Sequence, residues 1–206
     1  GADAGAIEYV YALMAKEAGV EMMPVHLFDA AKGSGYFATQ RFDREGDKRF
    51  HMHTASGLLH SNFRMPSLDY EDLIALTGVL TKDVREIEKM FRLAVFNVLS
   101  HNRDDHGKNF SFLMGENGDW KLSPAYDLTF SSGPRGQQST MVMGEGQSPS
   151  VGHLLKLGEE AGLKESKVNE IVEQTKYALG HWEVLADKHG VAKTNIKFIQ
   201  SRIGTV

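Results

Sequence analysis

Three side chains with oxygen ligands stand at spacings that suit phosphoryl transfer, namely Asp104, Asn109 and Asp127. In that chemistry a carboxylate accepts the proton of an attacking hydroxyl, while an Asn oxygen and a second carboxylate hold Mg²⁺ against nucleotide phosphates. Four residues separate Asp104 from Asn109, so one tight loop can turn the first toward the hydroxyl and the second toward the metal. The pattern predicts that the three side chains meet at one cavity. The alternative is that they only cap and turn a polar loop.

Arg103-Asp104 followed by Asn109 matches the R-D-x-x-x-x-N pattern of the protein-kinase catalytic loop. Asn102 stands where that pattern usually has His, and Asp127 is followed by Leu-Thr instead of Phe-Gly. Because of these two departures, the assignment of a catalytic loop also depends on the elements predicted before and after the motif.

The preceding segment predicts a rigid support for this loop. Thr81 is expected to cap a helix over Lys82–Leu99, and the second half of that helix, Leu93–Leu99, is apolar all round except for Asn97. A helix that loses its polar face enters the core. The polar loop that follows is therefore expected to be held on a buried base.

A β-hairpin is expected to follow the polar loop. Its strands are predicted over Phe110–Met114 and Trp120–Leu122, because Asn117-Gly118 between them supplies the positive φ angles that tight hairpin turns need. The hairpin would return the chain so that Asp127 meets Asn109.

The remaining patterns predict a mostly helical α+β fold in one domain over residues 1–206. Arg49–His60 is ambiguous, and Phe130–Ser150, rich in Gly, Ser and Gln, is expected to be either an activation or substrate-docking loop or a flexible connector. The other expected elements are a helix over Ile7–Glu17, an antiparallel hairpin from Met22–Phe28 and Tyr36–Phe42, a helix from the cap Asp69 to near Gly78, and closing helices over Val151–Ala161, Glu165–His189 and Thr194–Ile203.

Composition narrows the classes of function. The 206 residues include no Cys, which excludes a disulfide scaffold, a Cys-based zinc site and a thiol nucleophile. A net charge of −4 argues against a nucleic-acid coat or a polybasic membrane binder. No apolar run approaches the ~18 residues of a membrane span, and the first residues show no secretory pattern. We expect a cytoplasmic protein without membrane contact.

Three motifs resemble the signature of HipA-family serine/threonine kinases. RDDHGKNFSF at residues 103–112 and LSPAYDL at 122–128 resemble the family patterns D-x-H-x-K-N-F-S and L-x-P-x-Y-D. QRFDR at 40–44 is similar to the family's E-R-F-D-R hinge segment, with Gln40 in place of Glu. The resemblance covers roughly Glu8 to Phe130, and the terminal helices match only in character.

The resemblance implies a role for each matching residue. Asp104 would be the catalytic base, and His106 would sit near the transferred phosphate of ATP. Asn109 and Asp127 would be the Mg²⁺ ligands. The hinge residues would border the adenine, mainly through backbone groups and one aromatic ring; they are Gln40, Arg41 and Phe42.

The resemblance also implies a fold and a biological context. The fold would be a kinase-like C-terminal lobe with small hairpins at the hinge and beside the catalytic loop. The parent protein would be an ATP- and Mg²⁺-dependent Ser/Thr kinase toxin, restrained by a HipB-like DNA-binding antitoxin and touching DNA only through it. Its substrate would be a translation component such as an aminoacyl-tRNA synthetase. The phosphate-holding Lys is expected upstream of this chain, with Glu8 as a candidate acidic partner, so the isolated chain is expected to transfer little phosphate.

Two other functions stay open. A metal-dependent phosphohydrolase would need His101, Asp104, Asp105 and His106 gathered on a metal. A kinase-like binding module would only dock a partner. His51 and His53 alternate on a possible strand and would bind a metal only with a third ligand, so an ordinary strand is the simpler interpretation.

Overall fold

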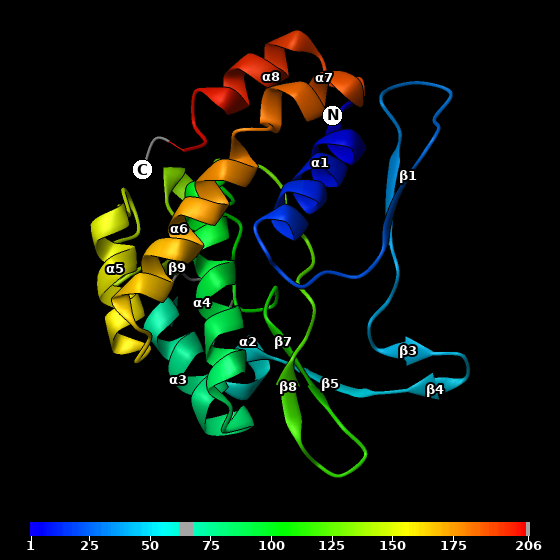
Figure 1. The fold of residues 1–206 in the computed structure, drawn as a ribbon. Helices are drawn as coiled ribbons and strands as arrows, with labels where there is room; N and C mark the ends of the chain where they lie inside the picture. Colours follow the sequence, from blue (N-terminus) through cyan, green and yellow to red (C-terminus); the bar gives the residue numbers. More distant parts are fainter. Residues whose placement is uncertain (62–67, 205–206) are drawn as a thin grey trace.

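The fold is organised around helix α4 (Val84–Leu99), which runs through the middle of the computed structural model (Figure 1). The structure describes residues 1–61 and 68–204. Every residue of Leu93–Leu99 is buried, as the all-round apolar pattern predicts, and the polar member Asn97 is buried with them. The polar loop at residues 100–109 thus leaves a helix end that is fixed in the core.

The start of α4 differs from the prediction. Asp83 is the N-cap, and its carboxylate accepts a hydrogen bond from the Arg85 N–H at 2.9 Å. The predicted cap, Thr81, is the last residue of the preceding helix, where its hydroxyl donates to the Thr77 carbonyl at 2.8 Å. Lys82 separates the two helices with a left-handed φ of 54°.

The preceding helix, α3 (Tyr70–Thr81), begins at the predicted cap Asp69 but passes Gly78 instead of ending there. Gly78 serves a close approach between helices, because a Cβ at this position would lie 3.3 Å from the Ile87 side chain on α4. Glycine here marks helix packing and not a helix end.

The remaining helices cover the sides of α4. The helix predicted over Glu165–His189 is two helices, since Trp182 turns into the core and donates its indole N–H to the Ile196 carbonyl at 3.1 Å. The bounds are α1 (Ala4–Glu17), α2 (Ala55–Leu58), α5 (Val151–Glu160), α6 (Glu165–Leu179), α7 (Trp182–Lys188), α8 (Lys193–Gln200) and the short 3-10 turn Pro134–Gly136.

Most strands form small sheets at one side of the helices, whereas the short pair of residues 68–69 and 140–141 lies apart from them, on the α5 side (Figure 1). Both predicted hairpins are confirmed, the first of them shorter than expected. The ambiguous segment Arg49–His60 continues from a strand into the short helix α2. The pairs are β1 (Val25–Phe28) with β2 (Tyr36–Thr39), β3 (Arg44–Glu45) with β4 (Lys48–Arg49), β5 (His51–Thr54) with β7 (Ser111–Met114) and β7 with β8 (Trp120–Leu122), all antiparallel, and β6 (Leu68–Asp69) parallel to β9 (Thr140–Met141).

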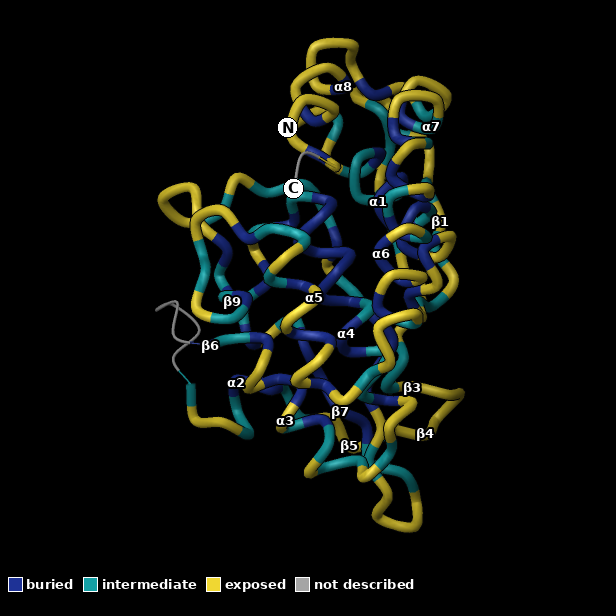
Figure 2. The backbone as a smooth tube through the Cα atoms, turned by 60° about the vertical axis from the view of Figure 1, so that its left-hand side comes forward, coloured by how far each residue is buried: buried dark blue, intermediate teal, exposed yellow. Residues whose placement is uncertain are grey.

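The architecture is the predicted α+β fold, mostly helical with small hairpins. Buried positions follow α4 and the faces of the helices turned toward it, whereas the β3–β4 hairpin is exposed (Figure 2). Within the described residues, no helix combines the length and apolar character needed to cross a membrane.

Candidate functional site

The loop after α4 gathers three of the predicted site residues. The carboxylate of Asp104 is 57% exposed, and its Oδ1 lies 4.0 Å from Nε2 of His106. The side-chain amide of Asn109 donates to the backbone carbonyl of Asp104 at 2.9 Å. This bond fixes the amide with its nitrogen toward the loop, so the oxygen is the atom left to receive a cation. The geometry fits a base and a metal ligand on one closed loop.

Asp127 is brought to the same region by its neighbour Tyr126. The Tyr126 hydroxyl donates to the backbone carbonyl of Lys108 at 2.5 Å and meets the Ser111 hydroxyl at 2.6 Å. A direct hydrogen bond therefore joins Lys108, which precedes Asn109, to Tyr126, which precedes Asp127. Asp127 itself has a left-handed φ of 57°, a conformation that costs free energy and is frequent at functional turns.

Glu8 on α1 faces the charge of Asp127. Burial and then the Asp127 charge raise the pKa of the Glu8 carboxyl to about 7. Two carboxylates and the Asn109 amide oxygen are the hard donors that Mg²⁺ prefers, so this donor set fits Mg²⁺. Asn109 and Asp127 would hold the ion, and Glu8 would add negative potential beside them.

The raised pKa of Glu8 predicts a pH-dependent stability. Because the folded-state pKa lies above the unfolded value, the contribution is fully present below pH 4.5 and is lost as the pH rises through about 7. Glu8→Gln removes this pH-dependent loss of stability, because glutamine does not ionise. Allowing for partial solvent screening, we expect the variant to exceed the wild type by about 1–2 kcal/mol in unfolding free energy at pH 8 and to match it near pH 4.5. Urea unfolding in metal-free buffer at several pH values measures this, and a pH-independent difference would contradict it.

A pocket of about 490 Å³ adjoins the loop and contains the three predicted adenine-bordering residues. Phe42 packs against Tyr126 with ring centroids 5.4 Å apart, which supplies an aromatic wall. The Arg41 guanidinium is held by the Asp43 carboxylate at 2.7 Å. The described lining residues are Met23, Thr39, Gln40, Arg41, Phe42, Asp43, Met52, Thr54, Lys108, Ala125 and Tyr126. Asp104, Asn109 and Asp127 are not among them, so they would border the pocket through Lys108 and Tyr126.

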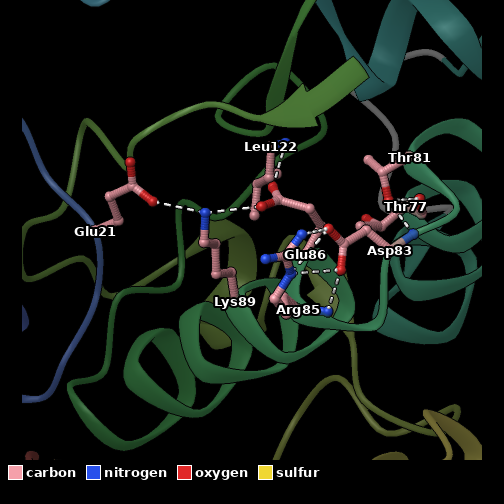
Figure 3. A network of polar contacts seen from close by, with 8 residues as sticks. All are labelled: Glu21, Thr77, Thr81, Asp83, Arg85, Glu86, Lys89 and Leu122. Carbon is pink, nitrogen blue, oxygen red and sulfur yellow. Dashed lines mark hydrogen bonds and ion pairs between the residues drawn. The ribbon is translucent and has the colours of Figure 1, made fainter. Parts of the chain in front are cut away.

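A polar network on α4 fastens two segments that lead to residues of this pocket (Figure 3). The Lys89 ammonium lies 2.8 Å from carboxylate oxygens of both Glu21 and Glu86. Glu86 is buried and accepts the Leu122 backbone N–H at 2.7 Å. The backbone carbonyl of Glu21 in turn accepts the Ala125 N–H at 2.8 Å. The segment before β1 and the segment leading to Asp127 are thereby both fastened to α4.

Asp105 is the main residue of the site region whose role the motif analysis missed. It is fully buried, and its carboxylate accepts hydrogen bonds from the Tyr70 hydroxyl at 2.7 Å and the Gln138 amide at 3.0 Å. It also accepts the backbone N–H groups of Ser139 and Thr140 at 3.0 and 3.2 Å. Burial raises the pKa of Asp105 to about 6, against the opposing effect of these donors. Asp105 therefore joins the loop after α4 to α3 and to the segment around residue 139.

The buried end of α4 belongs to the same network. The Asn97 amide donates to the Tyr70 hydroxyl at 3.0 Å and accepts from the Asn102 amide at 3.0 Å. An Asn inside an otherwise apolar helix half is the one signal in the sequence that pointed to a buried polar partner.

The segment over residues 130–150 is tied at several points to the loop after α4 and to the residues before α3. Besides the bonds to Asp105, the Arg103 guanidinium donates to the carbonyls of Gly136 and Gln147. The Asp69 carboxylate accepts the N–H groups of Met143 and Gly144 at 3.1 and 2.7 Å. These contacts disfavour a merely flexible connector and place the segment as a wall beside the loop of Asp104.

The geometry disfavours the histidine-based metal sites. His101 stacks on Phe130 at 5.4 Å, and Asp105 is turned into the core. His51 and His53 lie on β5 with ring centroids 6.4 Å apart. Within residues 1–61 and 68–204, no cluster of three or more His, Cys, Asp or Glu side chains is arranged to hold a metal. The proposed Asn–Asp pair is a different kind of donor set.

Comparison with known proteins finds relatives of this chain by sequence. The chain is 28% identical over 103 residues to the serine/threonine-protein kinase toxin HipA of Shewanella oneidensis, a stretch that is 50% of this chain and 22% of that protein. It is 40% identical over 53 residues to the putative kinase Y4mE of Sinorhizobium fredii, or 26% of this chain and 12% of that protein.

A solved structure shares the fold. One chain in the complex of HipA, HipB and operator DNA from Shewanella oneidensis matches with a TM-score of 0.75 at 17% sequence identity. The match covers 97% of this chain and 53% of that chain, so the present chain spans about half the length of this relative. The family of HipA-like C-terminal domains matches residues 2–182, which include residues 40–44, the loop of Asp104 and Asn109, and Asp127. The chain belongs to the HipA-like C-terminal domain family.

Proposed function

We propose that this chain is the catalytic portion of an ATP- and Mg²⁺-dependent protein serine/threonine kinase. The observation that carries the proposal is the junction made by Tyr126, whose hydroxyl bonds to the Lys108 carbonyl. It connects the loop of Asp104 and Asn109 to the segment of Asp127 and to the pocket that contains Phe42. Membership of a family with a kinase-named relative supports the same reaction class.

The residues divide the reaction between them. The exposed carboxylate of Asp104 accepts the proton of a Ser or Thr hydroxyl as its oxygen bonds to the γ-phosphorus. The bond from that phosphorus to the β-bridging oxygen breaks, and ADP carries away the electron pair. Asn109 and Asp127 would hold Mg²⁺, which would supply positive charge to neutralise the phosphates. His106, whose Nε2 lies 4.0 Å from Oδ1 of Asp104, would donate to a phosphate oxygen.

The pocket of about 490 Å³ receives the adenine in this proposal. The Phe42 ring supplies a stacking surface, and backbone groups of Gln40 and Arg41 supply the polar contacts. The Arg41 head group is occupied by Asp43, which supports a role for its backbone over its side chain.

The wider context is proposed by analogy with the relatives. The matched structure holds HipA together with HipB and operator DNA. We therefore propose a HipB-like antitoxin as the partner, DNA contact only through that partner, and a translation component such as an aminoacyl-tRNA synthetase as the substrate. A toxin role in the cytoplasm follows from the same analogy.

A phosphate-transfer assay tests the proposal. The longer protein that carries this chain is incubated with γ-labelled ATP, Mg²⁺ and candidate aminoacyl-tRNA synthetases, beside the 206-residue chain alone. We expect label on protein serine or threonine with the longer protein and little with the isolated chain. EDTA should abolish transfer. Release of free phosphate without any protein acceptor would favour the phosphohydrolase instead.

A further inference from the structure

A small pocket lies within the segment that forms the wall beside the loop of Asp104. Its volume is about 320 Å³, at the lower end of the range of about 300–1,000 Å³ that is usual for ligand sites. It is separate from the larger pocket assigned to the adenine, since none of the described lining residues belongs to both. We call it the glutamine pocket; it is lined by Gln137, Gln138, Met141, Gln147 and the turn at residues 144–146.

Hydrogen bonds hold the walls of the glutamine pocket in place. Val142 and Glu145 exchange backbone hydrogen bonds of 2.9 and 3.1 Å, and the Gln138 N–H donates to the Gly146 carbonyl at 2.8 Å. The Gln138 side-chain amide is anchored on the buried carboxylate of Asp105 at 3.0 Å. A side chain that enters the pocket therefore meets a preformed site, which lowers the entropic cost of binding.

Glu145 gives the pocket a negative charge, because it is the only charged residue in the sequence from 136 to 150. Its Oε1 accepts the backbone N–H groups of Gln147 and Ser148 at 2.6 and 2.9 Å. The N–H groups of Ser148 and Gln147 hold the pKa of the Glu145 carboxyl below its ordinary value, so this group is ionised at pH 7. Within residues 1–61 and 68–204, no hydrogen bond or ion pair engages its second oxygen, Oε2.

The other lining groups also suit a cation. Gln137 and Gln147 are exposed, and their amide oxygens can accept N–H groups of a Lys ammonium or an Arg guanidinium. Met141 can pack against the aliphatic stem of either side chain. Arg103 in the neighbouring loop donates to two backbone carbonyls, and no ion pair joins it to Glu145 among the residues that the structure describes. An anion in this pocket would meet the Glu145 charge.

Contacts of Arg103 place the pocket next to the proposed base. The Arg103 guanidinium donates to the Gln147 carbonyl at 3.2 Å, and Arg103 directly precedes Asp104. The Ser139 N–H donates to the Arg103 carbonyl at 3.1 Å. A protein chain whose hydroxyl reaches Asp104 therefore brings the residues beside that hydroxyl close to the glutamine pocket.

We propose that the glutamine pocket binds a lysine or arginine side chain of the protein acceptor, within a few residues of the hydroxyl that receives the phosphate. The proposal rests on the proposed function, because it takes Asp104 as the group that faces the acceptor. Glu145 is then a specificity-determining residue, which selects acceptors by charge and takes no part in the transfer itself. The expected acceptor is a serine or threonine with a basic residue nearby.

Peptide binding in the absence of nucleotide tests the pocket. Fluorescein-labelled dodecapeptides share one central serine and carry lysine, glutamine or glutamate at the second and third positions on both sides of it. Fluorescence anisotropy measures their affinity for the 206-residue chain at low salt. We expect the lysine peptide to bind about three- to tenfold more tightly than the glutamine peptide, and the glutamate peptide to bind most weakly. The preference should fade as salt approaches about 1 M.

Variants assign the preference to the pocket. Glu145→Gln keeps an oxygen for the N–H groups of residues 147 and 148 and removes the charge, so the ratio of lysine to glutamine affinity should fall close to one. Glu183→Gln, at an exposed position of α7, makes the same change of net charge elsewhere and should leave the ratio unchanged. Gln147→Glu adds a carboxylate to the lining and should raise the ratio. Thermal unfolding checks that each variant is folded.

Four results would overturn the proposal: equal affinity of the wild type for the lysine and glutamine peptides, no measurable binding of either, an unchanged ratio in Glu145→Gln or Gln147→Glu, or an equal loss of preference in Glu183→Gln. Because the assay contains no nucleotide, its failure is distinct from a failure to transfer phosphate. Transfer without lysine preference would refute the pocket alone. Lysine preference without transfer would refute the kinase and leave a site for basic peptides.

Discussion

Asp104→Asn in the longer protein is expected to lower the rate of phosphate transfer by about 10²–10⁴-fold while leaving the fold intact. Asparagine keeps the shape of the side chain but cannot accept the proton of the attacking hydroxyl. The carboxylate is 57% exposed, and Asn109 bonds to the backbone of Asp104, not to its side chain. The substitution therefore removes a proton acceptor without opening the loop.

The measurement is steady-state transfer of labelled phosphate, paired with the affinity for Mg²⁺·ATP and with thermal unfolding. We expect the rate to fall while nucleotide affinity and Tm stay near the wild-type values. Asp119→Asn, an exposed carboxylate in the β7–β8 turn, is the control and should retain activity. A variant at position 104 that turns over at the wild-type rate would mean that another group is the base.

The local part of this site follows from the sequence alone. A helix half without a polar face has to be buried, and Asn117-Gly118 has to turn, because both consequences depend on neighbours within one element. The buried end of α4 and the β7–β8 hairpin are accordingly where the pattern predicts them. The placement of the loop of Asp104 and Asn109 between them comes from the same local rules.

The long-range part does not follow from such rules. Glu165–His189 has an unbroken helical stripe, yet the chain breaks before Trp182 because the indole finds its acceptor at Ile196 in another helix. Thr81 has the character of an N-cap, but Lys82 adopts a left-handed conformation and shifts that role to Asp83. The position of each helix boundary depends on a contact or a backbone conformation that the periodicity of the sequence does not reveal.

Asp104 and Asp105 show the same limit at the site itself. The motif selects Asp104 by its spacing to Asn109, but nothing in it says where the neighbouring carboxylate of Asp105 lies. Tyr70, 35 residues earlier, and Ser139, 34 residues later, decide it by bonding to Asp105. Their hydrogen bonds leave Asp104 as the exposed carboxylate.

This difference between the exposed Asp104 and the buried Asp105 predicts different effects of the same substitution. Asp104→Asn is expected to lower activity, whereas Asp105→Asn is expected to lower stability. Asp105→Asn replaces an oxygen that accepts buried donors by an NH₂ group that faces them, so hydrogen bonds from Tyr70, Gln138 or the backbone at 139–140 are lost. We expect a loss of about 3–5 kcal/mol in unfolding free energy. Tyr70→Phe removes one donor only and should cost about 1–2 kcal/mol.

Urea unfolding of the chain and hydrogen exchange of residues 138–142 measure the two parts of this effect. The Asp105→Asn protein should exchange faster in that segment at urea concentrations where the wild type is still folded, because the carboxylate is what fixes the segment to the loop. Asp104→Asn is the matched control and should change neither quantity. Equal stability of the two variants would show that the Asp105 contacts do not hold the wall beside the base, and the positioning role assigned to residue 105 would then be wrong.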